Sequence, residues 1–445
     1  MNVREVLTKP VHIAPLVTFR IIFGAVMFAS VCRFVLKGWV YDLYIKPTFY
    51  FTYYGFDWVK PLGNGMYVLF ALMGLAAFCI MIGFLYRYAS ITFFLAFSYV
   101  ELIDKTNYLN HYYFISIISF LLIFLPAANY FSVDTLLKPE KTTSKIPLGI
   151  LGILMAQIGL VYFFAGLAKL NYDWLFRAMP LRIWLPADYD FPLIGTFFDQ
   201  VWVAYFFSWI SAFYDLAIPF LLLNKKTVKP AYGILLIFHA MTYALFNIGM
   251  FPFIMMGLTL LFFPESFHIG ILSKLQHLFH FRTTPKKIYP DSLYAPRKFL
   301  LVLVGIHFFI QILLPLRYIL YPGNLFWTEQ GYRFSWRVML MEKGGTNFFH
   351  VQDPATGNIC EVVPGRYLSP FQAKMMSTQP DMILQFAHYI DKEYRLKGIK
   401  DPIVTVESYV TLNGSGSRPF IDPKVDLSKQ KESFLPKLWL LPFQE

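Results

Sequence analysis

The chain has 445 residues, of which 57% are hydrophobic and only 15% are charged, with a net charge of +12. Soluble domains carry about 25% charged residues, so this composition excludes an ordinary soluble protein. The apolar residues form long blocks, and the lysines and arginines cluster in the short loops between them. This pattern favours a lipid bilayer as partner and gives no support for nucleic acid.

Nine apolar blocks follow one another along the chain, and each approaches the roughly 20 residues that a membrane-spanning helix needs. The blocks are 13–36, 64–86, 88–103, 111–128, 146–169, 201–223, 230–248, 250–264 and 299–320. The blocks at 88–103 and 250–264 are short, so either could be a re-entrant segment. We therefore predict a mainly α, polytopic membrane protein with about nine spans and a transmembrane domain over residues 1–320.

The charges of the connecting loops predict an orientation. If the N-terminus is cytoplasmic, fifteen lysines and arginines fall in the inner loops and seven in the outer loops. Much of the inner charge lies at 138–145, 225–229 and 274–298. Because basic residues favour cytoplasmic loops, we expect a cytoplasmic N-terminus, and nine crossings then place residues 321–445 outside.

Residues 321–445 have the pattern of a small α+β domain. The segments SWRVMLME (335–342), ICEVVPG (359–365) and PIVTVESYVTL (402–412) are typical of strands, and turn-forming residues occupy 351–358. Residues 370–397 carry helical apolar spacing. The three cysteines are far apart and show no ligand spacing, so we expect neither a disulfide framework nor a metal centre.

Lys169 is the most unusual polar residue, because it ends an apolar span in VYFFAGLAKLNYDW (161–174). A lysine in a low-dielectric phase loses hydration, so its neutral form gains weight and can act as a base. Two other interpretations stay open. The ammonium could snorkel to the interface, or it could pair with Asp173.

Two histidines also lie in apolar blocks. His111 opens the fourth span beside Asn110, where a helix-capping role is the alternative to a functional one. His239 lies inside the seventh span, where the alternative is a hydrogen bond to a neighbouring helix. Tyr332, just past the last span, is either an interfacial anchor or a ligand contact. The predicted topology places Lys169, His111 and Tyr332 at one face of the membrane.

Arg20 and Asp215 are further charges at membrane depth. A lone arginine in the bilayer needs a partner, and an aspartate is the least costly one. We expect both residues to form architectural pairs rather than to take part in chemistry.

Several segments carry a family resemblance, and they occur in the family's order along the whole chain. They are FRIIFG (19–24), DKTNYLNHYY (104–113), ANYFSVD (128–134), VYFFAGLAKLNYDW (161–174), HAMTYALFNIGMF (239–251), GYRFSW (331–336) and IDPKVDL (421–427). By these segments the chain resembles the vitamin K-dependent γ-glutamyl carboxylases and the wider group of bacterial HTTM proteins.

The resemblance implies roles for individual residues. Lys169 matches the lysine that deprotonates the quinol; the animal enzyme has two adjacent lysines, and Ala168 stands in place of the first. Asn110 and His111 match a pair that contacts the quinol. His239 matches a polar partner in the site, and Tyr332 matches a tyrosine near the quinone.

The resemblance also implies a reaction. The cofactor would be reduced vitamin K, a naphthohydroquinone, with dioxygen and carbon dioxide as co-substrates and no metal. Epoxidation of the quinol would be coupled to carboxylation of a glutamyl protein or peptide. The segment from Lys374 to Asp381 is poor in basic residues for a grip on acidic side chains. Two alternatives therefore stay open: a quinol oxygenase without glutamyl carboxylation, and a non-catalytic quinone-binding membrane protein.

Overall fold

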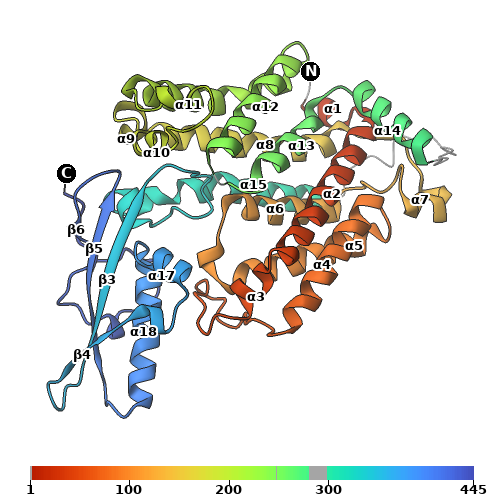
Figure 1. The fold of residues 1–445 in the computed structure, drawn as a ribbon. Helices are drawn as coiled ribbons and strands as arrows, with labels where there is room; N and C mark the ends of the chain where they lie inside the picture. Colours follow the sequence, from red (N-terminus) through yellow and green to blue (C-terminus); the bar gives the residue numbers. More distant parts are fainter. Residues whose placement is uncertain (1–2, 247, 280–297, 445) are drawn as a thin grey trace.

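The computed structural model describes residues 3–246, 248–279 and 298–444, and helices make up most of it (Figure 1). The helices of the first part are α1 (Val3–Thr8), α2 (Ala14–Leu36), α3 (Trp39–Tyr44), α4 (Gly65–Ile82), α5 (Tyr86–Ile103), α6 (Asn110–Phe124), α7 (Val133–Leu137), α8 (Leu148–Lys169), α9 (Tyr172–Phe176), α10 (Leu181–Ala187), α11 (Val201–Leu223), α12 (Val228–Leu245), α13 (Phe251–Thr259), α14 (Glu265–Phe279) and α15 (Lys298–Leu316). The short strands β1 (Pro10–His12) and β2 (Lys145–Pro147) pair antiparallel before α2 and α8.

A helix occupies each of the nine predicted apolar blocks, and the mainly α membrane fold is confirmed. Among the described residues, six helices are long and apolar enough to cross a bilayer: α2, α4, α8, α11, α12 and the helix from Phe299 to Leu320. A seventh crossing is possible if residues 251–278, which bend by 114° at a break, count as one span. The count of nine is therefore not confirmed, and residues 280–297 of the predicted basic loop lie outside the described part.

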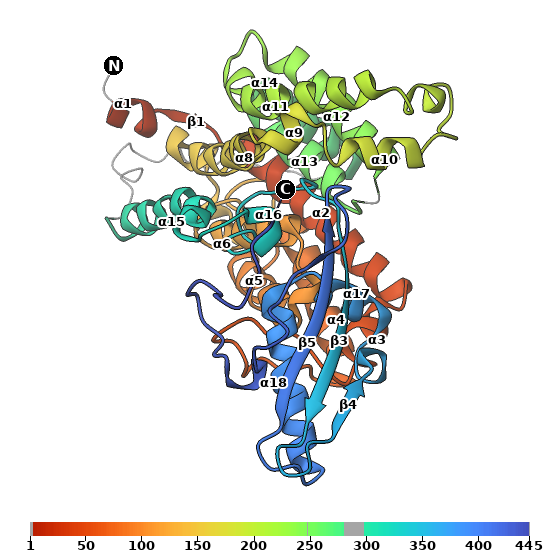
Figure 2. The same cartoon turned by 90° about the vertical axis from the view of Figure 1, so that its left-hand side faces the viewer.

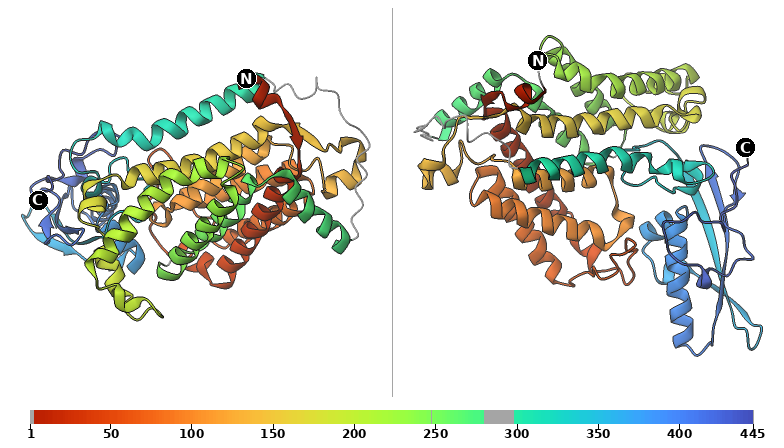
Figure 3. Two further views of the ribbon diagram at one scale, coloured as in Figure 1. Left: turned by 90° about the horizontal axis from the view of Figure 1, so that it is seen from above. Right: turned by 180° about the vertical axis from the view of Figure 1, so that it is seen from behind.

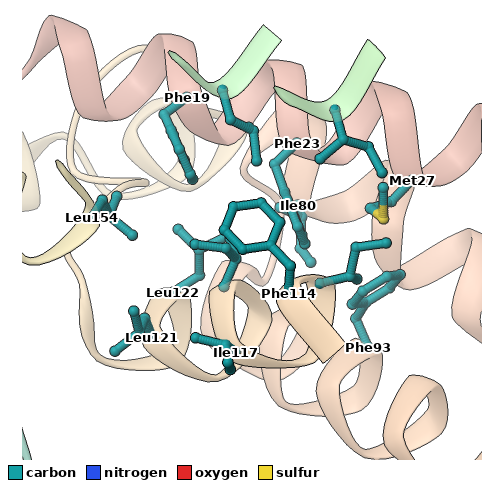
Figure 4. Close-up of a cluster of buried hydrophobic side chains, with 14 of the residues drawn as sticks. Phe19, Phe23, Met27, Ile80, Phe93, Phe114, Ile117, Leu121, Leu122 and Leu154 are labelled. Carbon is teal, nitrogen blue, oxygen red and sulfur yellow. The ribbon is translucent and has the colours of Figure 1, made fainter. Parts of the chain in front are cut away.

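The core of the membrane part lies where α2 crosses α4, α5 and α6. Phe19, Phe23 and Met27 of α2 face Phe93 of α5 and Phe114 of α6, and all five are buried (Figure 4). Close approach of α2 to α4 depends on Gly24, since a Cβ atom there would lie 2.5 Å from the backbone nitrogen of Met81. A stretch of small and aromatic residues therefore fixes the position of the first span against the next three.

The C-terminal part contains a four-stranded antiparallel sheet with the order β4-β3-β5-β6. Its elements are α16 (Leu325–Thr328), β3 (Lys343–Gln352), β4 (Ile359–Val362), α17 (Pro370–Met376), α18 (Pro380–Leu396), β5 (Ile403–Leu412) and β6 (Arg418–Pro419). Helix α18 lies along one face of the sheet (Figure 2), where Phe386 meets Phe349 with ring centroids 5.0 Å apart. Inward residues alternate along β5, as its period-2 pattern predicts.

The predicted strands at 359–365 and 402–412 are confirmed as β4 and β5, and the turn residues of 351–358 connect β3 to β4. The strand predicted at 335–342 is wrong, because the sheet begins only at Lys343. Phe334, Trp336 and Met339 have φ values of 59°, 59° and 54°, which no extended strand allows. The helix predicted at 370–397 is two helices, and the second begins with Pro380 at a position that proline favours.

Helices α8 and α15 run side by side toward the end of the membrane part that carries the sheet (Figure 3). Helix α6 begins at this same end. Three helix termini therefore lie on one side of the molecule. They are the end of α8 at Lys169, the start of α6 at Asn110 and the end of α15 at Leu316.

The contact at Gly24 leads to a prediction about stability. Gly24→Ala should lower the free energy of unfolding by about 1–3 kcal/mol, because the new methyl group meets the α4 backbone, which cannot move aside. Thermal unfolding of the purified protein in detergent measures the effect. Gly152→Ala in α8 is the matched control, since no heavy atom lies within 4 Å of its Cβ position. Equal melting temperatures for the two variants would contradict the tight α2–α4 contact.

Candidate functional site

Lys169 is the last residue of α8, and its side chain is buried rather than lifted to the interface. Its Nζ forms an ion pair with the carboxylate of Asp215 in α11. The rings of Trp174 and Phe238 flank the ammonium, with centroids 5.6 and 5.8 Å from Nζ. Helices α8 and α11 approach closely because Gly166 packs against the backbone of α11. The snorkelling interpretation is therefore wrong for this lysine.

Asp173 does not pair with Lys169 either. It binds Arg177 at 3.0 Å, and its second oxygen accepts a hydrogen bond of 2.8 Å from Asn413 in the C-terminal part. Asp215 is thus a residue of the candidate site, although the sequence predicts only a structural ion pair. The position of Asp215 deep in an apolar span indicates that a cationic side chain lies close to it. The sequence does not show which cation this is.

Arg20 has no carboxylate in contact among the described residues, so its predicted architectural pair is not observed. Its guanidinium donates hydrogen bonds of 2.9 and 2.7 Å to the carbonyl oxygens of Ala127 and Phe131. Both carbonyls lie in the loop after α6, so two guanidinium nitrogens are bound without an aspartate, while Nε has no hydrogen-bond partner among the described residues. Asp215 is consequently available to Lys169.

His239 is buried and meets α8 through Tyr162. The Tyr162 hydroxyl and His239 Nε2 are 2.8 Å apart, so a hydrogen bond links α12 to α8 as one of the two interpretations predicted. Tyr162 precedes Lys169 by seven residues and therefore lies on the same face of α8. The other ring nitrogen of His239 is buried without a partner among the described residues.

His111 lies in the first turn of α6 and is buried. The Phe251 ring stands between the two histidines, with centroids 5.7 Å from His111 and 6.1 Å from His239. The side chain of Leu109, not of His111, occupies the N-cap position, and no side chain caps this helix. The capping role suggested for His111 is therefore wrong.

Asn110 ties α6 to the segment that follows the last span. Its Nδ2 donates a 2.7 Å hydrogen bond to the Arg337 carbonyl, and its Oδ1 accepts one of 3.0 Å from Tyr108. The Tyr108 hydroxyl in turn accepts from the backbone of Phe334 at 2.7 Å. The amide of Asn110 is thus committed to holding residues 334–337 against the membrane part.

A pocket of about 220 Å³ opens beside the end of α8. Its walls include Leu167 and Ala168 of α8 and Leu316 at the end of α15, together with the polar side chains of Asn171 and Asn324. Ser335 and Arg337 supply polar groups on the remaining side. Lys169 follows directly after a wall residue and faces the interior of the bundle with Asp215.

Tyr332 is half-buried and does not line this pocket. Its ring packs against Phe326, a wall residue, with centroids 6.3 Å apart. Burial raises the pKa of the Tyr332 phenol, so the group stays neutral. The structure therefore joins Lys169, His239 and His111 through a series of ring and ion-pair contacts, whereas Tyr332 supports the pocket from behind.

Further unpaired polar atoms surround these residues. The hydroxyl of Tyr214 and the indole nitrogen of Trp336 are buried, and neither has a partner among the described residues. Tyr214 stacks on Phe238, and Trp336 stacks on Tyr113 of α6. Buried polar groups are normally paired, but neither of these two residues is among those that line the pocket beside α8.

Comparison with protein families gives two matches, which together cover most of the chain. The HTTM domain matches residues 8–267, and the vitamin K-dependent gamma-carboxylase, lumenal domain, matches residues 296–445. The first match contains α8, α11 and α12, and the second contains the sheet and the segment 331–337. No solved structure was found to match the chain.

The Lys169–Asp215 pair leads to a prediction that needs no knowledge of the reaction. Lys169→Met should lower the free energy of unfolding by about 3–5 kcal/mol, because it leaves a buried carboxylate without its cation. The double variant Lys169→Met/Asp215→Leu should regain most of this loss, since both charges are gone. Thermal unfolding in detergent measures both. Equal destabilisation in the single and double variants would contradict the energetic coupling of the pair.

Proposed function

Because the chain belongs to the vitamin K-dependent gamma-carboxylase family, with an HTTM domain followed by the lumenal domain, we propose that it is a membrane carboxylase. It would couple the oxygenation of a reduced naphthoquinone to its epoxide with the carboxylation of glutamyl residues. The observation that carries this proposal is the buried Lys169–Asp215 pair beside a pocket at the sheet-facing end of the bundle.

The residues present fit a reduced naphthoquinone. A flat, largely apolar ring system suits walls such as Leu167, Leu316 and Phe326, and its hydroxyl groups need the polar partners that Ser335 and Arg337 offer. When bound, the quinol supplies through its oxidation by dioxygen the driving force for removing a proton from the γ-carbon of a glutamyl side chain, which then takes up carbon dioxide.

Lys169 is the proposed base; it can receive the quinol proton only as the neutral amine, so the ion pair with Asp215 is the state that follows the transfer. In the apolar surroundings an isolated ammonium would be costly, but Asp215 turns the protonated lysine into an ion pair of zero net charge. The carboxylate also holds Nζ in place between the Trp174 and Phe238 rings. Asp215 is therefore proposed as the positioning residue of the base.

His111 and His239 are proposed as the further catalytic residues, and Asn110 and Tyr332 as residues that bind or support the cofactor together with Lys169. His239 presents an unpaired nitrogen while Tyr162 fixes its ring. His111 approaches the same cluster across Phe251. Asn110 acts through the backbone of Arg337, because its amide holds the polar wall of the pocket.

We propose a transmembrane domain of residues 1–320 with a cytoplasmic N-terminus, and an extracytoplasmic domain of residues 321–445. The second domain covers the site, because Asn413 binds Asp173 directly after α8 and Gln372 binds Asp104 before α6. A cover of this kind excludes water, which would otherwise quench a strongly basic reaction.

The reaction itself is tested with purified protein, reduced vitamin K, dioxygen, labelled bicarbonate and a glutamate-rich peptide. The wild-type protein should form both the epoxide and labelled peptide. Lys169→Ala should reduce both rates by about 10²–10⁴-fold, the usual contribution of a general base. Lys225→Ala is the matched control, because this exposed loop lysine should leave both rates unchanged.

The products separate the alternatives. Epoxide without labelled peptide would identify a quinol oxygenase and reject carboxylation. If the protein binds the quinol but forms neither product, it is a non-catalytic quinone-binding protein. Epoxide formation that persists in Lys169→Ala would remove this lysine as the base.

The proposed orientation is tested with a natural cysteine. Cys360 is exposed in β4, whereas Cys32 and Cys79 are partly buried in α2 and α4. A membrane-impermeant maleimide added to intact cells should label the wild-type protein, and Cys360→Ser should abolish the label. Labelling of Cys360 only after the cells are opened would place the sheet in the cytoplasm.

A further inference from the structure

The last span is attached to the rest of the bundle mainly by polar side chains. Within residues 299–316 of α15, the buried residues are His307, Gln311 and Pro315, at intervals of four. Large apolar residues of the same helix are exposed, as Phe309 is with 65% of its surface. Because residues four apart share one face of a helix, α15 presents a narrow stripe that contains two polar groups to the protein.

These polar groups bind two other helices. His307 Nε2 and Oε1 of the fully buried Gln157 in α8 are 2.8 Å apart. Gln157 Nε2 donates a longer bond of 3.5 Å to Gln311 Oε1, and Gln311 Nε2 donates to the Tyr113 hydroxyl of α6 at 2.8 Å. Within the described part of the chain, these are the side-chain hydrogen bonds between α15 and other helices. The four residues are called the polar clamp below.

Hydrogen bonds in a membrane fix a helix more specifically than apolar packing does. Apolar side chains contact lipid as readily as protein, so they do not determine where α15 lies. An amide or an imidazole turned toward hydrocarbon would lose its partner. The clamp therefore fixes both the rotation of α15 and its distance from α8 and α6. Glutamine side chains do not ionise, so the contact is suited to holding geometry rather than to moving charge.

The pocket beside α8 continues the interface of the clamp toward the sheet domain. Phe164 and Ala168 follow Gln157 on the same face of α8, and both line the pocket. On α15, Pro315 follows Gln311 by four residues and lines the pocket from the opposite side. Helices α8 and α15 run side by side here (Figure 3). They are thus held together about two turns, or about 10 Å, from the place where the pocket separates them.

The clamp also reaches the irregular segment that forms a third wall. The Tyr113 ring stacks on Trp336 and meets Phe334 edge-on, with ring centroids 5.0 Å apart in both pairs. Ser335 and Arg337, which flank Trp336, line the pocket beside α8. Phe334 lines a second pocket of about 150 Å³, the charged pocket, whose walls carry several ionised side chains. One series of hydrogen bonds therefore positions walls on two sides of the pocket beside α8.

From this arrangement we propose that His307, Gln157 and Gln311 are positioning residues that set the separation of α8 and α15 and thereby the width of the pocket. The inference rests on the proposed function only for the occupant, a reduced naphthoquinone. Lys169 is held separately, by Asp215 of α11. Loss of the clamp should therefore weaken quinone binding and raise the KM for the quinol, while kcat changes little.

The separation of the helices is measured without any ligand by pulsed electron paramagnetic resonance. Nitroxide labels are attached at Tyr172→Cys and Leu320→Cys, two exposed positions that flank the pocket without lining it, in a protein whose natural cysteines are replaced by serine. His307→Leu should broaden the distance distribution and move it to longer distances. His307→Gln, which keeps an N–H donor at this position, should restore the wild-type distribution. Phe309→Leu, a change on the exposed face of the same helix, is the matched control.

Quinone binding is measured in detergent by the quenching of tryptophan fluorescence with phylloquinone. His307→Leu should weaken binding about tenfold or more, because small displacements of binding groups are costly. His307→Gln and Phe309→Leu should bind like the wild type. Gly24→Ala controls for a general loss of stability, since it disturbs the α2–α4 contact and not the clamp. It should bind phylloquinone like the wild type although it melts at a lower temperature.

An unchanged distance distribution in His307→Leu would overturn the proposed role of the clamp. So would a changed distribution with wild-type quinone affinity, because the clamp would then support the fold without shaping the pocket. Equal defects in His307→Gln and His307→Leu would show that the hydrogen bond is not the cause. A wild-type protein that binds no quinone would contradict the proposed function, whereas the distance measurement would still decide whether the clamp sets the separation of the helices.

Discussion

The ion pair between Lys169 and Asp215 is the constraint on which the arrangement of the site depends. Two opposite charges in an apolar bundle are each costly alone, so neither side chain can leave the other. Their contact fixes the rotation of α8 against α11, and Gly166 lets the two backbones come close enough for it. Tyr162 and Trp174, which flank the lysine along the chain, are then directed toward α12 and α11 respectively.

The pair also explains why the sheet domain is placed where it is. Lys169 ends its helix, and the next residue, Leu170, is already half exposed. Asp173 in the next segment binds Asn413, so the domain closes directly over this end. At the start of α6, Lys105 binds Asp381 of α18 in a buried contact. The membrane part and the domain are thus joined by polar contacts at Asp173 and at Lys105.

Much of the fold could be predicted from the sequence, because apolar blocks and period-2 strands are local patterns. The site could be predicted only in part. Depth along a span is visible in the sequence, and it made Lys169 and His239 candidates for the site. The direction in which a side chain points is not visible in the sequence. The sequence therefore does not predict the Lys169–Asp215 pair, and it predicts for Arg20 a carboxylate partner that the arginine does not contact. The number of crossings is also undetermined by length alone, since α6 has 15 residues and α13 ends at a sharp bend.

The most instructive difference is the segment 335–342, which alternates like a strand but does not form one. Left-handed backbone at Phe334 and Trp336 turns successive side chains in different directions. Ser335 and Arg337 therefore line the pocket beside α8, while Arg333 and Phe334 line the charged one.

Residues of DKTNYLNHYY hold this segment from the membrane side. Asn110 binds the Arg337 carbonyl, and Tyr108 accepts a hydrogen bond from the Phe334 backbone. The tertiary contacts of Trp336 with α6 outweigh its local preference for a strand. A single irregular wall thus separates the pocket beside α8 from the charged pocket that Arg333 and Phe334 line.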